Sequence, residues 1–256
     1  MNIEVRTREY ITKAMAGASN FEREKVVKDW LRKDTIAPKI VEDFTKRAGN
    51  PEGKEVLDVG FGNGLTAAAF VSAGAKVAGL EVSEDLAQFA QEVFADRELD
   101  ANLQLYDGTH FPFENNTFDY AYSVSVLEHT SDPQAVLSEV ARVLKPGGKF
   151  YLAFPNKLNP KETHTGLWLL SYLPRGVASR VAQLFGRSNL DEYWNLHFIS
   201  YFKLKQMLRR GHVPFEVEFD RSGEGLKGLL KRVLASVGIH HSALLPHVMV
   251  ILRKRV

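Results

Sequence analysis

The segment from Val56 to Gly64 reads Val-Leu-Asp-Val-Gly-Phe-Gly-Asn-Gly, and it constrains the fold more than any other part of the chain. Apolar residues lead into a tight turn in which glycine recurs at every second position, at Gly60, Gly62 and Gly64. A helix-like stretch follows from Leu65 to Ser72. Glycines at such a turn let the backbone approach a ligand where a Cβ would collide. The pattern predicts a strand, a ligand-binding turn and a helix in succession.

An acidic residue, Glu81, closes the next strand-like run, from Lys76 to Glu81. In an open parallel sheet this residue lies at the carboxyl edge of the neighbouring strand. Its carboxylate can there accept hydrogen bonds from the two hydroxyls of a ribose. The glycine turn and Glu81 together predict a nucleoside cofactor.

The spacing of the glycines indicates which nucleoside. A dinucleotide site needs Gly-x-Gly-x-x-Gly, with a pyrophosphate over the helix N-terminus. Here the third glycine comes one residue early, and Asp58 stands two residues before the first. A carboxylate beside the turn disfavours a pyrophosphate and suits a ligand with an ammonium group and no phosphate. S-adenosylmethionine is such a ligand.

On these residues the chain resembles the class I S-adenosylmethionine-dependent methyltransferases, and among them the ubiquinone and menaquinone biosynthesis methyltransferases. Tyr106–Phe113 resembles the segment after the family's third strand. Phe118–Ser123 resembles the fourth strand, which continues into Val126–His129, and Leu144–Gly148 resembles the turn before the fifth. With the glycine turn, five motifs occur in the family's order within roughly residues 55 to 155.

The resemblance implies a role for each matching residue. Asp58 is expected to hold the methionyl ammonium, Glu81 the ribose diol, and Asp107 the adenine amino group. The further residues expected to bind the cofactor are Gly60, Phe61, Gly62, Gly64, Val82, Gly108, Thr109 and Ser123. For Asp107 the alternative is a purely structural role in the turn before Gly108. For Val82 and for Phe111, a second candidate to flank adenine, the alternative is core packing.

His129 is the candidate catalytic residue, because it follows the fourth strand at the ligand-binding edge of such a sheet. Methyl transfer is an in-line displacement at a carbon that is already electrophilic. The enzyme therefore mainly positions the acceptor, and it needs a base only where the acceptor must lose a proton. A histidine has a suitable pKa for that task. The alternative is a histidine that bonds a helix N-terminus or lines the cofactor pocket.

Residues 156–199 interrupt the strand–helix alternation and are expected to form an insertion over the acceptor. The candidate substrate-binding residues there are His164, Trp168, Tyr172, Trp194 and His197. Aromatic and histidine side chains suit an apolar pocket with a few polar groups, whereas a small satellite core is the structural alternative. No metal site is expected, since the triplet His240, His241 and His247 has no carboxylate at ligand spacing.

Strands that alternate with helices predict an α/β, doubly wound, Rossmann-like sheet that is mainly parallel. The resemblance implies seven strands, with the last antiparallel and placed between the fifth and the sixth. A single domain, 1–256, is expected. Its parts are an N-terminal helical cap (1–50), a cofactor-binding half (51–155), the substrate-cap insertion (156–199) and the C-terminal half of the sheet (200–256). Helices are expected in the cap at Phe21–Leu31 and from about Pro38 to Ala48.

Charge is distributed unevenly. Residues 1–150 contain 17 Lys and Arg against 24 Asp and Glu, whereas residues 151–256 contain 16 against 7. The segments Gly176–Arg187 and Leu226–Val237 are basic and amphipathic, which favours either contact with an anionic membrane or lipid-linked substrate, or ordinary packing on the core.

The chain contains no cysteine, which excludes thiolate nucleophiles and iron–sulfur radical chemistry. The N-terminus has charges where a signal peptide needs an apolar run, and no stretch reaches the ~20 apolar residues of a membrane span. A cytoplasmic location is therefore expected, with peripheral membrane contact as the alternative that the basic segments leave open.

The sequence thus predicts methyl transfer from S-adenosylmethionine to a small or lipid-linked acceptor, on oxygen in preference to carbon or nitrogen. A nucleic acid is disfavoured, because Ser123–Val126 stands where nucleic-acid amine methyltransferases carry an Asn/Asp-Pro-Pro-aromatic clamp. Two alternatives remain. One is a non-catalytic methyltransferase-like binding module, and the other is a nicotinamide-dependent oxidoreductase, which the glycine spacing and Asp58 oppose.

Overall fold

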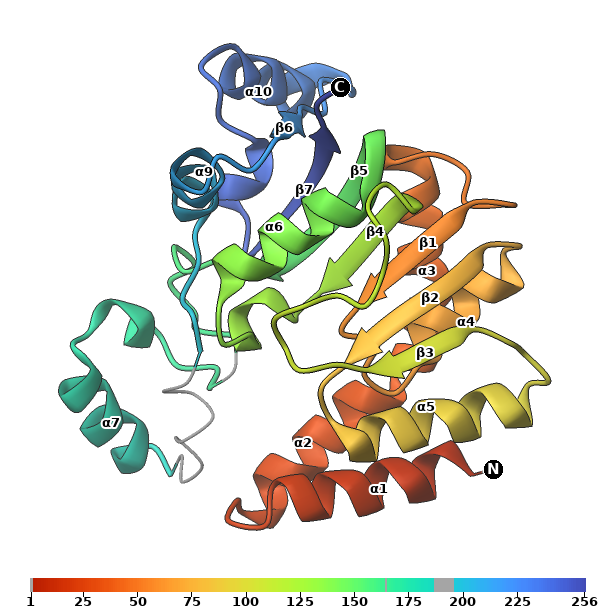
Figure 1. Cartoon of the computed structure of the whole chain (residues 1–256). Coiled ribbons are helices and arrows are strands. Elements are labelled where there is room, and N and C mark those ends of the chain that lie inside the picture. Colours follow the sequence, from red (N-terminus) through yellow and green to blue (C-terminus); the bar gives the residue numbers. More distant parts are fainter. Residues whose placement is uncertain (1, 164, 187–195) are drawn as a thin grey trace.

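A seven-stranded sheet forms the centre of the molecule (Figure 1). The computed structural model describes residues 2–163, 165–186 and 196–256. The strand order is β3-β2-β1-β4-β5-β7-β6, and β7 pairs antiparallel with both of its neighbours. The expected α/β Rossmann-like class is confirmed, as is the antiparallel last strand between the fifth and the sixth.

The strands are β1 Glu55–Val59, β2 Lys76–Glu81, β3 Asn102–Leu105, β4 Phe118–Val124, β5 Leu144–Pro155, β6 Phe215–Glu218 and β7 His247–Lys254. The helices of the first half are α1 Ile3–Ala14, α2 Asn20–Leu31, α3 Lys33–Arg47, α4 Leu65–Ser72, α5 Glu84–Asp96 and α6 Pro133–Val143. Those of the second half are α7 Arg175–Leu184, α9 Tyr201–Arg210 and α10 Gly225–Ser236. Short 3₁₀ turns are η1 Leu127–His129, η2 Leu170–Tyr172 and η3 His241–Leu244.

Local capping explains where several helices begin. The Ser83 side chain accepts a hydrogen bond from the Leu86 N–H, and the Ser200 side chain accepts one from the Lys203 N–H. Each hydroxyl satisfies a backbone donor that a helix N-terminus leaves without an intrahelical partner. The helices α5 and α9 therefore begin directly after Ser83 and Ser200.

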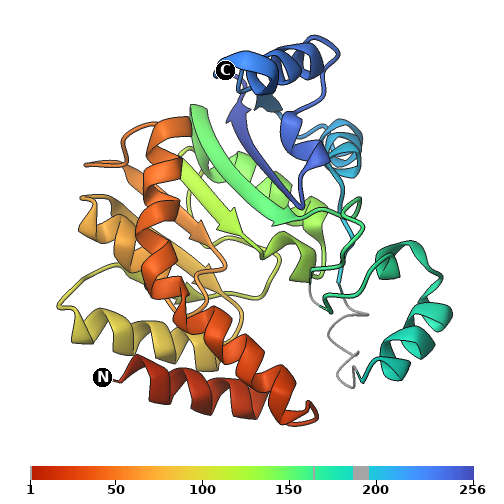
Figure 2. The same ribbon diagram turned by 180° about the vertical axis from the view of Figure 1, so that it is seen from behind.

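The two faces of the sheet are covered by different helices. Leu57 of β1 belongs to the apolar core under α6 and α9, whereas its neighbour Val56 belongs to the core under α3, α4 and α5. Figure 2 shows α3 lying across the second face. Because side chains alternate along a strand, Asp58, Glu81 and Tyr122 also lie on the α3 side of the sheet.

Two expected boundaries are wrong. The second cap helix begins at Lys33 rather than near Pro38, so Pro38 lies inside α3. Proline removes one backbone hydrogen bond and strains the turn, but burial of Ala37, Val41 and Phe44 stabilises the helix in its place. The fifth strand begins at Leu144 rather than Lys149, since Leu144 pairs with Phe118 across a register shift.

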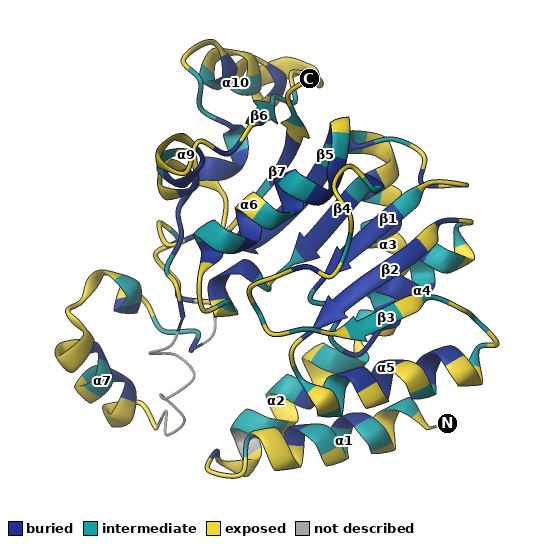
Figure 3. Ribbon diagram, viewed as in Figure 1, coloured by how far each residue is buried: buried dark blue, intermediate teal, exposed yellow. Residues whose placement is uncertain are grey.

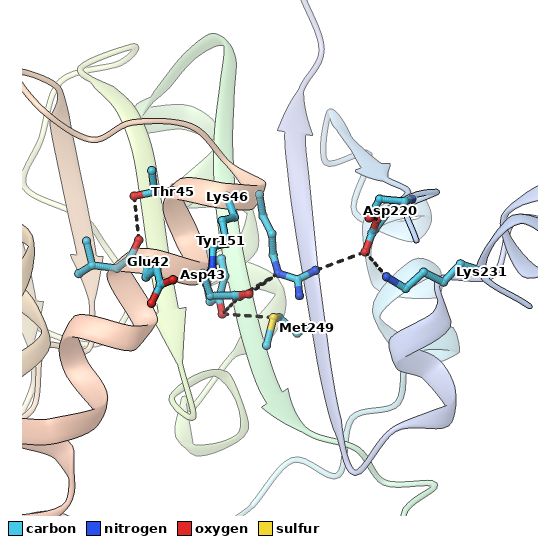
Figure 4. Close-up of polar contacts among 11 residues, drawn as sticks. Glu42, Asp43, Thr45, Lys46, Tyr151, Asp220, Lys231 and Met249 are labelled. Carbon is cyan, nitrogen blue, oxygen red and sulfur yellow. Dashed lines mark hydrogen bonds and ion pairs between the residues drawn. The ribbon is translucent and has the colours of Figure 1, made fainter. Parts of the chain in front are cut away.

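The C-terminal end of α3 is joined to the last third of the chain by a row of charged groups (Figure 4). Asp43 accepts hydrogen bonds from the Tyr151 hydroxyl of β5 at 3.0 Å and from Arg47 Nε at 2.8 Å. Arg47 Nη1 lies 3.8 Å from Asp220 Oδ2, to which Lys231 of α10 donates at 2.6 Å. The row connects α3 across β5 to α10.

Burial follows the layers (Figure 3). The central strands are buried, whereas α7 and α10 are largely exposed. Among the residues that the structure describes, no helix is long and apolar enough to cross a membrane.

Candidate functional site

The glycine turn after β1 has a left-handed backbone at each glycine, with φ +83° at Gly60, +55° at Gly62 and +76° at Gly64. A Cβ at Gly60 would lie 2.5 Å from a methyl carbon of Val126, and one at Gly64 would lie 2.7 Å from the Ala90 Cβ. A Cβ at Gly62 would meet nothing within 4 Å. Packing therefore requires the outer two glycines, while the middle one faces open space that a ligand can use.

Glu81 holds this turn in place from the end of β2. Its Oε2 accepts a hydrogen bond from the Gly62 N–H at 2.9 Å. Its Oε1 accepts from the N–H groups of Val82 and Ser83 at 2.8 and 3.0 Å. The buried carboxylate thus joins the glycine turn to the start of α5, at the carboxyl edge of the sheet.

Asp58 lies beside Glu81 on the same face of the sheet and is only 2 % exposed. The Tyr122 hydroxyl donates a hydrogen bond to Asp58 Oδ2. Burial raises the pKa of Asp58 to about 8; the Tyr122 hydrogen bond lowers it, the Glu81 charge raises it further, and Lys33 opposes that rise. A carboxyl group in this environment ionises readily only when a cation comes close.

A cation from the N-terminal cap, Lys33, interacts electrostatically with both carboxylates. Lys33 Nζ lies 4.2 Å from the centre of the Trp30 ring, which itself stacks on Tyr10 with ring centroids 5.0 Å apart. Burial lowers the pKa of Lys33, while the charges of Glu81 and Asp58 raise it. No local sequence signal indicates Lys33, because it lies far upstream of the glycine turn at the first residue of α3.

Asp107 forms a tight turn after β3. Its Oδ1 accepts hydrogen bonds from the His110 N–H, the Thr109 N–H and the Thr109 hydroxyl, each at 2.8 Å. These bonds lower the pKa of Asp107 to about 2. The side chain is exposed, and its second oxygen accepts no hydrogen bond from the described residues. Gly108 has a φ of +85° in the same turn. The turn role is observed, while the adenine contact stays a prediction.

The other residues expected to bind the cofactor differ in which of their groups are accessible to a ligand. The Phe61 ring packs in a small cluster with Ala87 and Ala90, so that only its backbone is available at the turn. Val82 is 61 % exposed, whereas Phe111 is buried in the core. The Ser123 hydroxyl donates to the Val59 carbonyl at 3.0 Å, which joins β4 to β1 beneath the turn.

His129 lies in η1, directly after β4, with its side chain about one third exposed. Its Nε2 is 3.9 Å from Oε1 of the buried Glu128, which is too long for a hydrogen bond but within reach of an ion pair. The backbone N–H of His197 donates to the Glu128 carbonyl at 2.7 Å. The fold therefore brings the backbone of His197 next to Glu128, the residue before His129, although the two segments are far apart in sequence.

The insertion places its other candidates at the surface. Trp168 is 69 % exposed, and Tyr172 is half exposed with its hydroxyl bonded to the Leu158 carbonyl at 2.7 Å. His164 and Trp194 lie outside the described residues. Beside His197 there is a cavity of about 20 Å³, whose polar lining includes Glu128, Asn156 and Glu162. Such a volume holds about one water molecule, and Trp168 and Tyr172 do not line it.

A larger cavity of about 400 Å³ lies between α1 and α5. Its walls are charged and paired with one another, with Lys13 bonded to Asp85 at 2.6 Å and Arg6 to Glu92 at 2.9 Å. These ion pairs leave it without the apolar lining of a small-molecule pocket. One wall of this cavity is α5, which begins three residues after Glu81.

Residues 57–152 match the model of a family described as "Methyltransferase domain". The ubiquinone biosynthesis O-methyltransferase of Coxiella burnetii (strain Dugway 5J108-111) is 32% identical over 145 residues, which cover 56% of this chain and 62% of the relative. That of Hydrogenovibrio crunogenus is 28% identical over 70% of this chain and 80% of its own length. A demethylmenaquinone methyltransferase of Geobacillus sp. (strain WCH70) is 35% identical over 49% of this chain and 58% of its own length.

Solved structures share the fold. An S-adenosylmethionine-dependent methyltransferase from Mesorhizobium loti superposes with a TM-score of 0.53 at 18% identity, covering 80% of this chain and 93% of that one. The [4+2]-cyclase SpnF superposes with a TM-score of 0.57, also at 18% identity, covering 86% of this chain and 81% of that one. The same architecture thus carries more than one activity, and the reaction has to be argued from the site.

Proposed function

We propose that the chain is a class I S-adenosylmethionine-dependent methyltransferase and that it transfers the methyl group of that cofactor to an oxygen of a small or lipid-linked acceptor. The observation that carries the proposal is the pair of buried carboxylates, Asp58 and Glu81, at the glycine turn. Two carboxylates in this arrangement suit a nucleoside with an amino-acid tail, because Glu81 can accept from the ribose hydroxyls while Asp58 holds the ammonium group.

The residues at the turn fit the cofactor. The open side of Gly62 leaves room for the ligand beside the backbone. Glu81 Oε2 accepts one hydrogen bond in the structure, so it retains capacity for a ribose hydroxyl. Asp58 would hold the methionyl ammonium, whose charge compensates the cost of ionising a buried carboxyl group. Asp107 would accept from the adenine amino group through its second oxygen.

The bound cofactor supplies a methyl group on a positively charged sulfur, a carbon that is already electrophilic. The protein mainly has to hold the acceptor oxygen in line with that carbon and exclude water. His129 would accept the proton of an acceptor hydroxyl. The nearby Glu128 carboxylate, 3.9 Å from Nε2, would stabilise the imidazolium that results.

The class of acceptor is supported by the relatives, which are named for ubiquinone biosynthesis and for demethylmenaquinone. The chain spans about three fifths of the length of the Coxiella burnetii relative, and the family model matches residues 57–152, in the cofactor half. The proposal for the class of acceptor therefore also depends on the side chains of the insertion, residues 156–199. Trp168 and Tyr172 expose apolar surface, and His197 stands next to the Glu128 backbone.

Calorimetry and a methyl-transfer assay test the proposal together. The protein should bind S-adenosylhomocysteine and should not bind NADH. It should transfer labelled methyl groups from S-adenosylmethionine into a lipid-extract fraction or a small phenolic acceptor. Binding without transfer to any fraction would leave a non-catalytic binding module as the better description. NADH binding would overturn the cofactor assignment.

The matched variant is Glu81→Gln, which keeps the size of the side chain and removes its charge. It should weaken S-adenosylhomocysteine binding by about 1.5–3 kcal/mol for each charge-assisted hydrogen bond lost. The variant Glu84→Gln is the control, because Glu84 lies one turn away on α5 and accepts none of the described hydrogen bonds at the glycine turn. Equal affinity in both variants would remove Glu81 from the site.

A further inference from the structure

The helix α10 buries small side chains and exposes large apolar ones, which is the reverse of an ordinary surface helix. Its buried residues are the small ones, Gly228 and Ala235. Leu234 is partly buried, but the other large apolar residues are exposed to between 49 % and 82 %, namely Leu226, Leu229, Leu230, Val233 and Val237 just beyond the C-terminus of the helix. Their spacing of three, four, seven and eleven residues from Leu226 places them on one stripe, opposite Gly228 and Ala235.

The inner face cannot accept these large side chains. A Cβ at Gly228 would lie 2.0 Å from the Gly223 carbonyl oxygen, so the preceding loop packs directly on the helix backbone. Lys231 is also tied down on the inner side, by its 2.6 Å hydrogen bond to Asp220. The helix is therefore fixed with its apolar stripe facing outward. A surface helix normally directs such a stripe at the core, so the stripe needs a partner.

The charges around the stripe indicate which partner. Lys227 lies on one flank and Arg232 on the other, both exposed. Lys205 of α9 donates to the Gly238 carbonyl at 3.0 Å, which places a third exposed cation at the C-terminal end of the helix. Residues 219–245 contain two carboxylates, Asp220, which is paired with Lys231, and Glu224 at the N-terminus of the helix. The surface is apolar in the middle and positive at its edges.

We propose that the α10 face, formed by Leu226, Leu229, Leu230, Val233 and Val237 with their flanking cations, docks on an anionic lipid bilayer. An interfacial helix of this kind buries its apolar face at the acyl boundary while lysine and arginine reach the phosphate headgroups. A second copy of the chain fits less well, since pairing two such faces would bring the cations of both copies together. Docking does not rest on the proposed methyl transfer.

The position of α10 gives the docking its role. In Figure 1 α10 lies at the end of the molecule opposite α1 and α2, away from the carboxyl ends of β1, β2 and β4, and Figure 2 agrees. The docking face is thus separate from the cofactor residues. It recruits the protein to a membrane, and changes in it leave the cofactor site intact.

Vesicle co-sedimentation without cofactor tests the proposal. The protein should bind vesicles of phosphatidylcholine mixed with phosphatidylglycerol about tenfold more tightly than pure phosphatidylcholine, and salt near 1 M should remove the difference. The double variant Leu229→Gln/Val233→Gln should lose about tenfold or more in this binding. Lys227→Gln/Arg232→Gln should lose the preference for anionic vesicles.

The control is Val5→Gln, which changes a residue of α1 that is similarly exposed, at 52 %, and should bind vesicles like the unmodified protein. S-adenosylhomocysteine affinity serves as the measure of folding and should stay equal in all variants. Equal binding to both kinds of vesicle, or unchanged binding of the leucine–valine variant, would overturn the proposal. So would a dimer in solution that Leu229→Gln/Val233→Gln dissociates, because the face would then be a protein interface.

Discussion

Tyr122 donates its hydroxyl hydrogen bond to the buried carboxyl group of Asp58, directly beneath the glycine turn. The Tyr122 ring is held by stacking on Phe70, with ring centroids 4.3 Å apart. The pair connects the protonation of the cofactor site to the packing of the core, and this makes the site sensitive to pH.

Cofactor binding should release a proton. The pKa of Asp58 is about 8, so the group is mostly protonated at pH 6–7 and must ionise to hold an ammonium. Affinity for S-adenosylhomocysteine should rise up to about tenfold per pH unit between pH 6 and 8. Calorimetry in buffers of different ionisation enthalpy measures the released proton, and binding without proton release would contradict the assignment.

Asp58→Asn should bind cofactor weakly and yet be more stable at high pH. A carboxyl pKa raised in the folded state means that the folded protein binds more protons than the unfolded chain between about pH 4 and pH 8. The free energy of unfolding therefore falls as the pH rises through that range. Asparagine removes this loss, so the variant should melt higher at pH 9 by at least about 2–4 °C, the shift that accompanies each 1 kcal/mol. Identical melting curves would show that Asp58 is ionised without cost.

Alanine at Gly62 should mainly reduce cofactor affinity, whereas alanine at Gly60 should mainly reduce stability. Gly62→Ala places a methyl group in open space and should cost about 1–2 kcal/mol of stability for its left-handed backbone, while cofactor affinity falls much further. Gly60→Ala drives its Cβ into Val126 and should lose stability first. Thermal unfolding and calorimetry of the two variants decide the matter. Normal affinity in Gly62→Ala would mean that the open space belongs to solvent.

His129→Gln should lower turnover about 10²-fold if His129 is the base, with cofactor affinity nearly unchanged. The acidic limb of the pH–rate profile should disappear at the same time. His212→Asn is the matched control, because His212 is exposed on the loop after α9 and its loss should leave turnover unaffected. A variant that loses cofactor affinity but keeps its pH profile would place His129 in the wall of the cofactor pocket.

Stability in mild acid should depend on His240. Burial lowers the pKa of this histidine to about 4, with His241 and Arg47 adding to the effect. The unfolded chain then binds the proton more readily, so the free energy of unfolding should fall as the pH decreases from about 6.5 to 4, by about 3 kcal/mol at most. The His240 Nδ1 accepts the Ser242 N–H, an acceptor role that His240→Asn retains. Urea titrations should give this variant a flatter acid slope, and parallel slopes would assign the loss to other groups.

The cofactor half of the site could be predicted from sequence because its signals are local. The strand, turn and helix around Gly60–Gly64 are contiguous, and Glu81 ends the next strand, so one periodicity argument places all of them at the same edge of the sheet. The ranges of β2 and α4 agree with the prediction to the residue. The bonds that Glu81 makes with three backbone N–H groups were not foreseen, since they depend on the loop conformation.

The remaining features depend on contacts between distant segments. Lys33 interacts electrostatically with Glu81 and Asp58 from the first residue of α3, which continues through Pro38 against the local preference of proline. His197 approaches Glu128 because the chain returns to η1 after the insertion. Phe61 stands in the glycine motif, yet its ring turns toward Ala87 and Ala90. Hydrophobic pattern and turn chemistry say nothing about such pairings, which packing decides.

The helix α3 has Lys33 at its first residue and Arg47 at its last. A 15-residue helix is about 22 Å long, and a hydrogen-bonded rod of that length is far stiffer than the loops at its ends. Lys33 interacts electrostatically with the two carboxylates of the glycine turn, whereas Arg47 takes part in the charged row that ends at Lys231 of α10. Because both cations belong to one rigid helix, a tilt of α3 would change the electrostatic surroundings of Asp58 and of Asp220 together.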